Sequence, residues 1–317
     1  MRRYSFCFLT AFFLSCLFCY LLIPVLRKLK AGQNILSYVK EHKGKSGTPT
    51  MGGLAFVFAA VLTTVLFYKK WDRTLVVTLT VGVSYLCVGF LDDLFKKRRK
   101  ENLGLKAWQK IVFQTFVAVF AGVYCVRSGY TKIYLPFFGG TLDFGKWTAV
   151  FCVFVFLSTV NCVNLTDGLD GLASAVSLPF FLALGVILCM QQNNPSLPIL
   201  CFSFGGALGG YLLFNSSPAS VFMGDTGSLA LGGFISCVAL FSGNALFIPV
   251  IGAAFVLSGV TVILQVLYFK ATKGKRIFLM APVHHHFQQK GYSETKISYA
   301  YAVATTVLGV LSIVCML

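Results

Sequence analysis

Ten apolar segments run through the chain, and their length constrains the fold more than any other feature. Most approach the ~20 residues that a helix needs to cross the hydrocarbon core of a bilayer. Backbone groups inside lipid must be satisfied within their own segment, so these segments are predicted to be helices. We expect spans at about 5–26, 51–68, 74–91, 107–126, 147–165, 171–190, 198–214, 225–242, 245–269 and 297–315.

Composition supports a membrane protein and one domain. The 317 residues are 57% hydrophobic and 12% charged, whereas soluble domains carry about a quarter charged residues. The first apolar segment is longer than the core of a signal peptide and lacks a small-residue cleavage site, so we predict it to be the first span. With no domain boundary, low-complexity tract or clear repeat, residues 1–317 are predicted to form a single all-α polytopic membrane domain.

The basic residues predict the orientation. Of the 27 lysines and arginines, six lie in 27–48, seven in 92–110 and six in 270–296. These segments follow spans one, three and nine, so they share one face, which the positive-inside bias makes cytoplasmic. Ten spans then place both termini outside. Topology accounts for the net charge of +17, and no nucleic-acid partner is expected.

The ten acidic residues separate into two groups. Five lie in polar loops and are expected to be solvated: Glu41, Asp72, Glu101, Asp143 and Glu294. The other five lie at the predicted cytoplasmic ends of apolar spans: Asp92, Asp93, Asp167, Asp170 and Asp225. An ionisable residue at such a depth is a functional hypothesis by default.

Helix capping competes with function for some of these aspartates. Asp170 and Asp225 stand near the start of a span, where a carboxylate satisfies free N–H groups. Asp92 and Asp93 follow a span and would oppose its dipole, so they need a cation. The neighbouring residues 96–99 are all basic and could supply one, and so could a divalent metal. Oxygen ligands without cysteine point to Mg²⁺, which also binds substrate phosphates.

The surroundings of the aspartates suggest phosphoryl transfer. Lys45 and Lys110 are expected at the same depth, and Asn164 and several glycines stand beside the carboxylates. Metal and lysines would neutralise phosphate charge while the protein supplies positioning. A transporter of lipid or nucleotide sugar is the alternative. It would place its carboxylates near the bilayer midplane, where these spans are almost free of charge.

Three of the four histidines are consecutive, in the sequence PVHHHFQQKG from Pro282 to Gly291. Successive helical residues point about 100° apart, so three adjacent imidazoles cannot all bind one ion. We therefore interpret His284, His285 and His286 as hydrogen-bond donors to a diphosphate, ribose or sugar, on a loop or a helix start. His286 is the one that could instead anchor the loop.

Five motifs together resemble a known family. They are HKGKSGTPTMGG (42–53), FLDD (90–93), NCVNLTDGLDGLA (161–173), FMGDTGSLALGG (222–233) and PVHHHFQQKGYSETKI (282–297). They are similar to the phospho-N-acetylmuramoyl-pentapeptide transferases, within the polyprenyl-phosphate N-acetylhexosamine-1-phosphate transferase superfamily. The resemblance implies Mg²⁺-dependent attack of undecaprenyl phosphate on the β-phosphate of UDP-N-acetylmuramoyl-pentapeptide. The products would be UMP and lipid I, a precursor of peptidoglycan, the bacterial cell wall polymer.

The same resemblance implies roles for individual residues. Asp92 and Asp93 match the family's aspartate pair, with Asp92 the better choice for a base that deprotonates the lipid phosphate. Asp225 matches the principal Mg²⁺ ligand, and Asp167 is a second metal candidate. The catalytic set is Asp92, Asp93, Asp225 and His284.

The residues assigned to substrate binding are more numerous. They are Lys45, Lys110, Asn164, Asp167, Gly168, Asp170, Asn215, Phe222, His285 and His286. The resemblance places the two lysines near the uridine and diphosphate, and Phe222 on the uracil with Asn215 nearby. The competing interpretation of Phe222 is ordinary packing, since the chain has 32 phenylalanines.

Three questions stay open at the level of sequence. The transfer can be a direct displacement or a double displacement through an aspartate nucleophile. A related transferase that uses UDP-N-acetylglucosamine is the alternative within the same class. Oligomeric state is not decided, although many membrane enzymes pair and a homodimer is one expectation.

Overall fold

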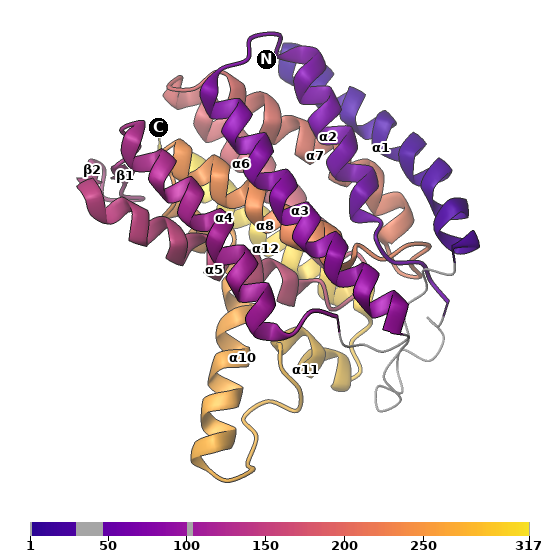
Figure 1. The fold of residues 1–317 in the computed structure, drawn as a ribbon. Helices are drawn as coiled ribbons and strands as arrows, with labels where there is room; N and C mark the ends of the chain where they lie inside the picture. The colour runs from indigo at the N-terminus through magenta and orange to yellow at the C-terminus, as the bar shows by residue number, and fades with distance from the viewer. Residues whose placement is uncertain (1, 30–46, 100–103, 317) are drawn as a thin grey trace.

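The computed structural model describes residues 2–29, 47–99 and 104–316, which form a bundle of helices with one small hairpin (Figure 1). The first seven helices are α1 (Arg2–Lys28), α2 (Gly53–Phe67), α3 (Arg73–Arg99), α4 (Ala107–Arg127), α5 (Thr148–Thr166), α6 (Leu172–Gln191) and α7 (Ser196–Asn215). They are followed by α8 (Gly224–Phe241), α9 (Phe247–Ile251), α10 (Ala253–Ala271), α11 (Val283–Gln289) and α12 (Glu294–Val314). The hairpin pairs β1 (Lys132–Tyr134) antiparallel with β2 (Thr141–Asp143).

The prediction of an all-α polytopic membrane protein is confirmed. Within the described part of the chain, nine helices are long and apolar enough to cross a membrane, and α2 is a shorter apolar helix. The helix in the expected span at 51–68 starts later than predicted, because the backbone before it pairs with Phe222. Phe222 N donates to Pro49 O at 2.8 Å and Gly52 N donates to Phe222 O at 2.9 Å. The helix therefore begins only at Gly53.

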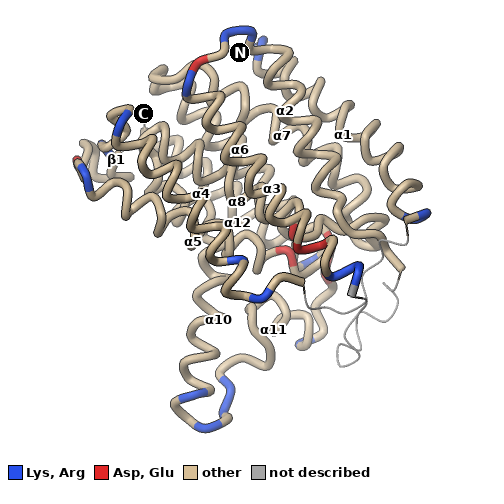
Figure 2. The backbone as a smooth tube through the Cα atoms, viewed as in Figure 1, with Lys and Arg blue, Asp and Glu red and all other residues tan. Residues whose placement is uncertain are grey.

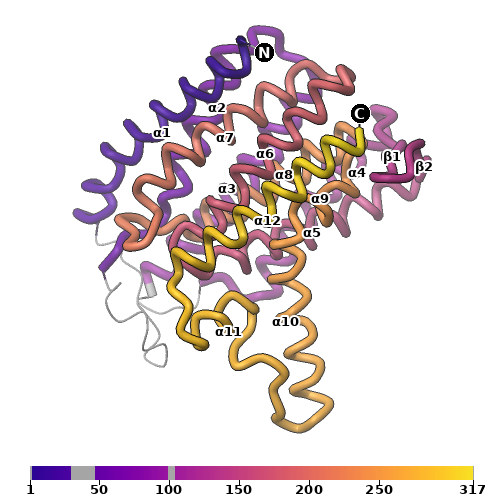
Figure 3. Tube along the Cα trace, turned by 180° about the vertical axis from the view of Figure 1, so that it is seen from behind, coloured from indigo at the N-terminus to yellow at the C-terminus, as the bar shows by residue number. Residues whose placement is uncertain are grey.

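Helix α8 lies at the centre of the bundle. In the most apolar stretch of α8, 89% of the residues are buried, whereas the corresponding share in α1 is 28%. It packs against α2, α3 and α5, and both views show it enclosed by other helices (Figures 1 and 3). A helix that is apolar all round belongs in such a position. Its first turn is therefore placed by neighbours on several sides.

The ninth predicted span, 245–269, is not one helix. The structure divides it at Gly252 into α9 and α10. Gly252 N still donates to Ile248 O at 2.8 Å, but the chain turns there, and α10 extends away from the bundle with α11 beside it (Figure 1). Apolar composition continues through the break, so the sequence pattern predicts a single span.

Two further local differences from the prediction have clear causes. Helix α3 continues eight residues beyond the expected end at 91, so Asp92 and Asp93 lie inside a helix and not after it. Ion pairing of Asp92 with Lys96 at i,i+4 favours this extension. The hairpin was not predicted, because strands of three residues carry little periodic signal.

Asp72 corrects the expectation of a solvated loop carboxylate. It accepts hydrogen bonds from Tyr68 Oη at 2.7 Å and from Leu75 N at 2.7 Å, and so satisfies a free N–H group in the first turn of α3.

The chain termini and the acidic cluster lie toward opposite ends of the bundle. The start of α1 and the end of α12 lie together at one end, and the acidic cluster lies toward the other (Figure 2). Basic residues occur near that cluster, at the far tip of α10 and also at the end that holds the termini (Figure 2).

Candidate active site

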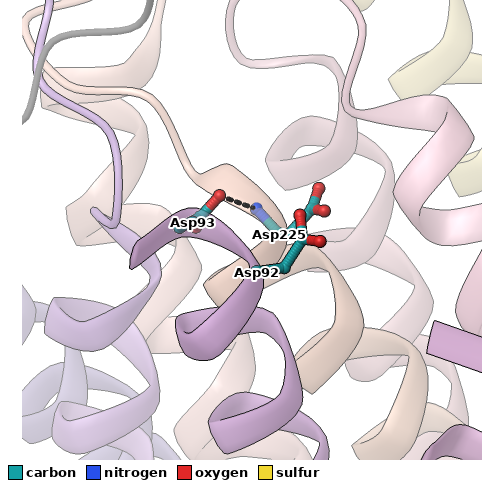
Figure 4. A group of neighbouring side chains, drawn as sticks. All are labelled: Asp92, Asp93 and Asp225. Atoms are coloured by element: carbon teal, nitrogen blue, oxygen red, sulfur yellow. Dashed lines mark hydrogen bonds between the residues drawn. The ribbon is translucent and has the colours of Figure 1, made fainter. Parts of the chain in front are cut away.

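The site is built where α3 meets the first turn of α8. Gly89 on α3 allows a close approach: a Cβ placed there would lie 2.1 Å from Asp225 O. One helical turn further along α3 stand Asp92 and Asp93. Among the described residues, Asp92, Asp93 and Asp225 each offer a carboxylate oxygen, and these oxygens lie within 4.8 Å of one another (Figure 4).

Two lysines neutralise this cluster. Lys96 Nζ lies 2.7 Å from Asp92 Oδ2 and 2.9 Å from Asp225 Oδ2, with Asp93 Oδ1 farther away at 3.9 Å. Lys110, on α4, contacts Asp225 Oδ2 and lies 3.5 Å from Asp92 Oδ2. One oxygen of Asp92 and one of Asp225 therefore face the same pair of ammonium groups.

The remaining oxygens of these two carboxylates are held by neutral donors. Leu105 N donates to Asp92 Oδ1 at 2.8 Å. Asn164 Nδ2, on α5, donates to Asp225 Oδ1 at 2.8 Å and also lies 2.8 Å from Ser228 Oγ. Residues from α3, α4, α5 and α8 thus converge on one point. The sequence-predicted residues Asp92, Lys110, Asn164 and Asp225 are among them.

Asp167 and Gly168 form the turn that follows α5. Burial raises the pKa of the Asp167 carboxyl well above its usual range, and the negative charges of Asp225, Asp93 and Asp170 add to this effect. Among the described residues Asp167 is not one of the three carboxylates in the tight cluster. It is near enough to sense that cluster electrostatically, and a cation bound there would lower the pKa of the Asp167 carboxyl.

The three histidines of α11 have three different surroundings. His284 is fully buried, and neither of its ring nitrogens has a hydrogen-bond partner among the described residues. His285 Nδ1 lies 3.1 Å from Gln288 Oε1. His286 Nδ1 accepts from Leu279 N at 3.1 Å, which is the anchoring role suggested as its alternative. Among the described residues, the group placed to hold a metal ion consists of Asp92, Asp93 and Asp225 and includes no histidine.

Gly168 connects the histidines to the aspartates. A Cβ at this position would lie 2.4 Å from His284 Nε2 and 2.8 Å from His285 Nε2. Only hydrogen there lets α11 pack against the Asp167–Gly168 turn. Burial, followed by the neighbouring His285, lowers the pKa of His284 to about 3, so its ring is neutral at neutral pH.

Other predicted site residues hold loops in place. Asp170 Oδ2 accepts from Ala219 N at 3.1 Å. Asn215 accepts from Ser174 Oγ at 2.9 Å and donates to Val221 O at 3.0 Å. These contacts fix the segment before α8. The roles of Asp170 and Asn215 toward a substrate stay predictions.

Glu294 was expected to be solvated, and the structure corrects this. Its carboxylate accepts from Asp170 N at 2.9 Å and from Gln288 Nε2 at 3.1 Å. It therefore ties the turn after α5 to α11 and α12. The spacing of sequence motifs carries no signal for such a contact between distant segments.

Phe222 is half-buried, and its backbone pairs with Pro49 and Gly52 as described above. Lys45 lies outside the described residues. Lys96 is the main residue to which the sequence assigned no specific role. Its position four residues after Asp92 and three after Asp93 is the signal that could have identified it.

The donor set fits a divalent cation. Asp92 Oδ2 and Asp225 Oδ2 already share Lys96 Nζ, so both oxygens are directed at one positive charge. Carboxylate oxygens without sulfur are the ligands that Mg²⁺ prefers.

Comparison with known proteins identifies the class. The model of glycosyl transferase family 4 matches residues 74–243, more than half of the chain. This stretch contains the aspartates of α3, the turn after α5 and the start of α8. The fold and the matched region define a multi-pass membrane glycosyl transferase.

A narrower match and full-length relatives specify the family. Residues 45–57 match signature 1 of phospho-N-acetylmuramoyl-pentapeptide-transferase. The transferase of that name from Clostridium perfringens strain 13 is 45% identical over 288 residues, covering 90% of each chain. The one from Clostridium kluyveri is 40% identical over 311 residues, covering 97% of this chain and 98% of its own. The one from Caldanaerobacter subterraneus subsp. tengcongensis is 42% identical over 286 residues, covering 90% of each. The chain belongs to the phospho-N-acetylmuramoyl-pentapeptide-transferase family.

Proposed function

We propose that this chain transfers phospho-N-acetylmuramoyl-pentapeptide from its UDP donor to undecaprenyl phosphate, which yields lipid I and UMP for peptidoglycan synthesis. The observation that carries the proposal is the convergence of Asp92, Asp225, Lys96 and Lys110, joined to the His284 helix through Gly168. Family membership supplies the substrate pair. The cluster supplies the charge that two anionic phosphates require.

In the proposed reaction an oxygen of the lipid phosphate attacks the β-phosphorus of the donor. The bond from the β-phosphorus to the bridging oxygen breaks, and UMP carries that electron pair away. Asp92 takes the proton from the lipid phosphate, if one is present. Lys96 and Lys110 lie on the same side of the aspartates and can bind the equatorial phosphate oxygens.

Mg²⁺ is the proposed cofactor, with Asp225 as the principal ligand and Asp167 as the second. Asp92 shares Lys96 with Asp225 and lies within reach of the same cation. When bound, the cation would neutralise the diphosphate charge. Burial and nearby negative charge raise the pKa of Asp167, and a bound cation would favour its ionised form.

The histidine helix is proposed to face the donor. The unpartnered nitrogens of His284 can form hydrogen bonds without giving up any contact among the described residues. His285 and the half-buried Phe222 are proposed to bind the sugar and the uracil. Lys45 is proposed to bind near the diphosphate.

The membrane orientation is also part of the proposal. The aspartate cluster faces the cytoplasm of a bacterial inner membrane, and both termini lie outside, as the positive-inside bias indicates. An acceptor phosphate held by a lipid chain can reach a site only at the membrane surface. The position of the carboxylates near the end of α3 and at the start of α8, two helices long and apolar enough to cross a membrane, supports this proposal.

One assay tests the function. Purified protein is incubated with Mg²⁺, undecaprenyl phosphate and UDP-N-acetylmuramoyl-pentapeptide, and UMP is followed. We expect UMP release only when all three are present, and little release when UDP-N-acetylglucosamine replaces the donor. Donor uptake into vesicles without UMP would instead indicate a transporter.

A second assay tests the direct displacement. Donor labelled in the β-phosphate is mixed with the protein without lipid acceptor. We expect no UMP and no labelled protein, because the carboxylates are ion-paired and the lysines can align both phosphates. A labelled phosphoryl-enzyme adduct formed together with UMP would establish the double displacement.

A further inference from the structure

The first turn of α8 is capped by another helix. The residue before it, Met223, is apolar and makes no side-chain cap. Asp93 on α3 supplies the missing acceptors: Oδ1 accepts from Asp225 N at 3.3 Å, and Oδ2 accepts from Thr226 N at 3.0 Å. Asp93 Oδ2 also accepts from Thr226 Oγ1 at 2.7 Å. Free N–H groups of a helix start are thus satisfied by a carboxylate distant in sequence.

Asp93 points away from the pair formed by the other two carboxylates. Figure 4 shows the Asp92 and Asp225 carboxylates side by side, while the Asp93 carboxylate turns toward the backbone of Asp225. The lysine distances agree, since Lys96 Nζ is 3.9 Å from Asp93 but within 3 Å of the other two. Adjacent residues of one helix diverge by about 100°, so Asp92 and Asp93 serve different neighbours.

The local backbone is shaped around this contact. Gly224 has a φ of 71°, and a Cβ on it would lie 2.5 Å from Asp93 Oδ2. Both facts require glycine at the entry to α8. Gly89, one turn before Asp93 on α3, touches Asp225 O closely. Helix α3 therefore holds the first turn of α8 at two points.

We infer that Asp93 is a positioning residue: it caps α8 from α3 and thereby aims the Asp225 carboxylate at Lys96, Lys110 and Asn164. This inference deepens the proposed function and rests on it only for the importance of Asp225. Asp93 bonds to the backbone of the residue whose side chain forms the site. A shift of the first turn would move Asp225 Oδ1 and Oδ2 together.

The role requires a carboxylate. Both oxygens of Asp93 accept from donors, so the NH₂ group of an asparagine would face an N–H or O–H donor. A negative charge at a helix N-terminus also interacts favourably with the helix dipole. The variant Asp93→Asn should therefore loosen the first turn of α8.

Residue-resolved hydrogen exchange by mass spectrometry tests this cap directly. In Asp93→Asn the amides of Asp225 and Thr226 should exchange on the order of ten times faster than in the parent. The matched control is Asp92→Asn, whose partners are Leu105 N and the lysines; these two amides should exchange as in the parent. Unchanged exchange in Asp93→Asn would overturn the inference.

Mn²⁺ binding, followed by electron paramagnetic resonance, gives a second readout independent of UMP release. A positioning residue acts through Asp225. Asp93→Asn should therefore weaken Mn²⁺ binding in the parent and add no further loss in an Asp225→Ala background. An additional loss there would make Asp93 an independent ligand and refute the inference.

Thr226 keeps the test decisive if Asp93→Asn fails to fold. Thr226→Val removes only the hydroxyl donor to Asp93 Oδ2, and Thr226→Ser retains it. Exchange at Thr226 and the Mn²⁺ dissociation constant should each rise several-fold in Thr226→Val and return to parent values in Thr226→Ser. Parent-like behaviour of Thr226→Val in both measurements counts against the cap. Because neither readout needs turnover, a failure of the proposed function would leave these results intact.

Discussion

The aspartate cluster and the histidine helix α11 differ in how their polar groups are partnered. In the cluster, Asp92 and Asp225 are paired with Lys96 and Lys110, so the charges are largely balanced within the protein. In the helix, His284 is buried and neutral, and neither ring nitrogen has a partner among the described residues. Burying an unpartnered polar group costs about 1–3 kcal/mol.

This difference indicates how each region would respond to a ligand. A cation arriving at the aspartates must compete with two ammonium groups for the same oxygens. A sugar or phosphate that reached the fully buried His284 would add a hydrogen bond without breaking one that the described residues make. On the proposed function, we expect electrostatic competition to govern binding at the first region and an unsatisfied buried group to favour binding at the second.

Removing a carboxylate from the cluster should have the largest effect. Asp225→Asn takes away the negative charge that both lysines and the proposed cation require, so turnover should fall by at least about 10³-fold. UMP release as a function of Mg²⁺ concentration measures it, with size-exclusion behaviour confirming the fold. The matched control is Asp143→Asn on the exposed strand β2, which should retain activity. Full activity of Asp225→Asn would refute the metal assignment.

Removing a lysine tests the competition itself. Lys96→Met removes one of the two ammonium groups beside Asp92 and Asp225, so Mn²⁺ should bind up to about tenfold more tightly. The thermal stability of the metal-free protein should fall, because the two carboxylates lose a partner. Lys97→Met is the control, since no ion pair of Lys97 is described in the structure. Weaker Mn²⁺ binding in Lys96→Met would show that the lysine supports the metal site and does not compete with it.

A larger side chain at the contact between α11 and the turn after α5 should weaken binding of the UDP donor. Gly168→Ala places a methyl group 2.4 Å from His284 Nε2, so α11 must move away from the turn. The dissociation constant for the UDP donor should rise about tenfold, measured by calorimetry in the absence of lipid acceptor. Gly209→Ala, where a Cβ would meet its nearest atom at 3.4 Å, is the control for a glycine substitution. Parent-like affinity in Gly168→Ala would separate the histidine helix from donor binding.

The last prediction concerns pH and His284. The folded protein holds this ring neutral down to about pH 3, whereas an unfolded histidine binds a proton below about 6.5. Stability should therefore fall as pH drops below 6.5, by on the order of 2 kcal/mol at pH 5. His284→Gln should show a smaller loss of thermal stability between pH 7.5 and pH 5, and His285→Gln should behave as the parent. An equal loss in all three proteins would contradict the assignment.

The sequence determined the architecture because spanning a bilayer leaves few choices. Apolar length predicted helices at nearly every position where the structure has them, since backbone groups in lipid must pair within their own segment. Motif order and residue type also identified Asp92, Lys110, Asn164 and Asp225, which the structure brings together. The break at Gly252 was missed because apolar composition is the same on both sides of it.

Only the tertiary structure distinguished the roles of similar residues. Asp92 and Asp93 are chemically identical neighbours in the sequence, yet one pairs with lysines and the other caps α8. Glu294 and Asp170 were assigned by local context, whereas their partners lie on distant segments. The physical reason is directional. A sequence states which groups are present, but a hydrogen bond depends on where a side chain points, and that is decided when the helices pack.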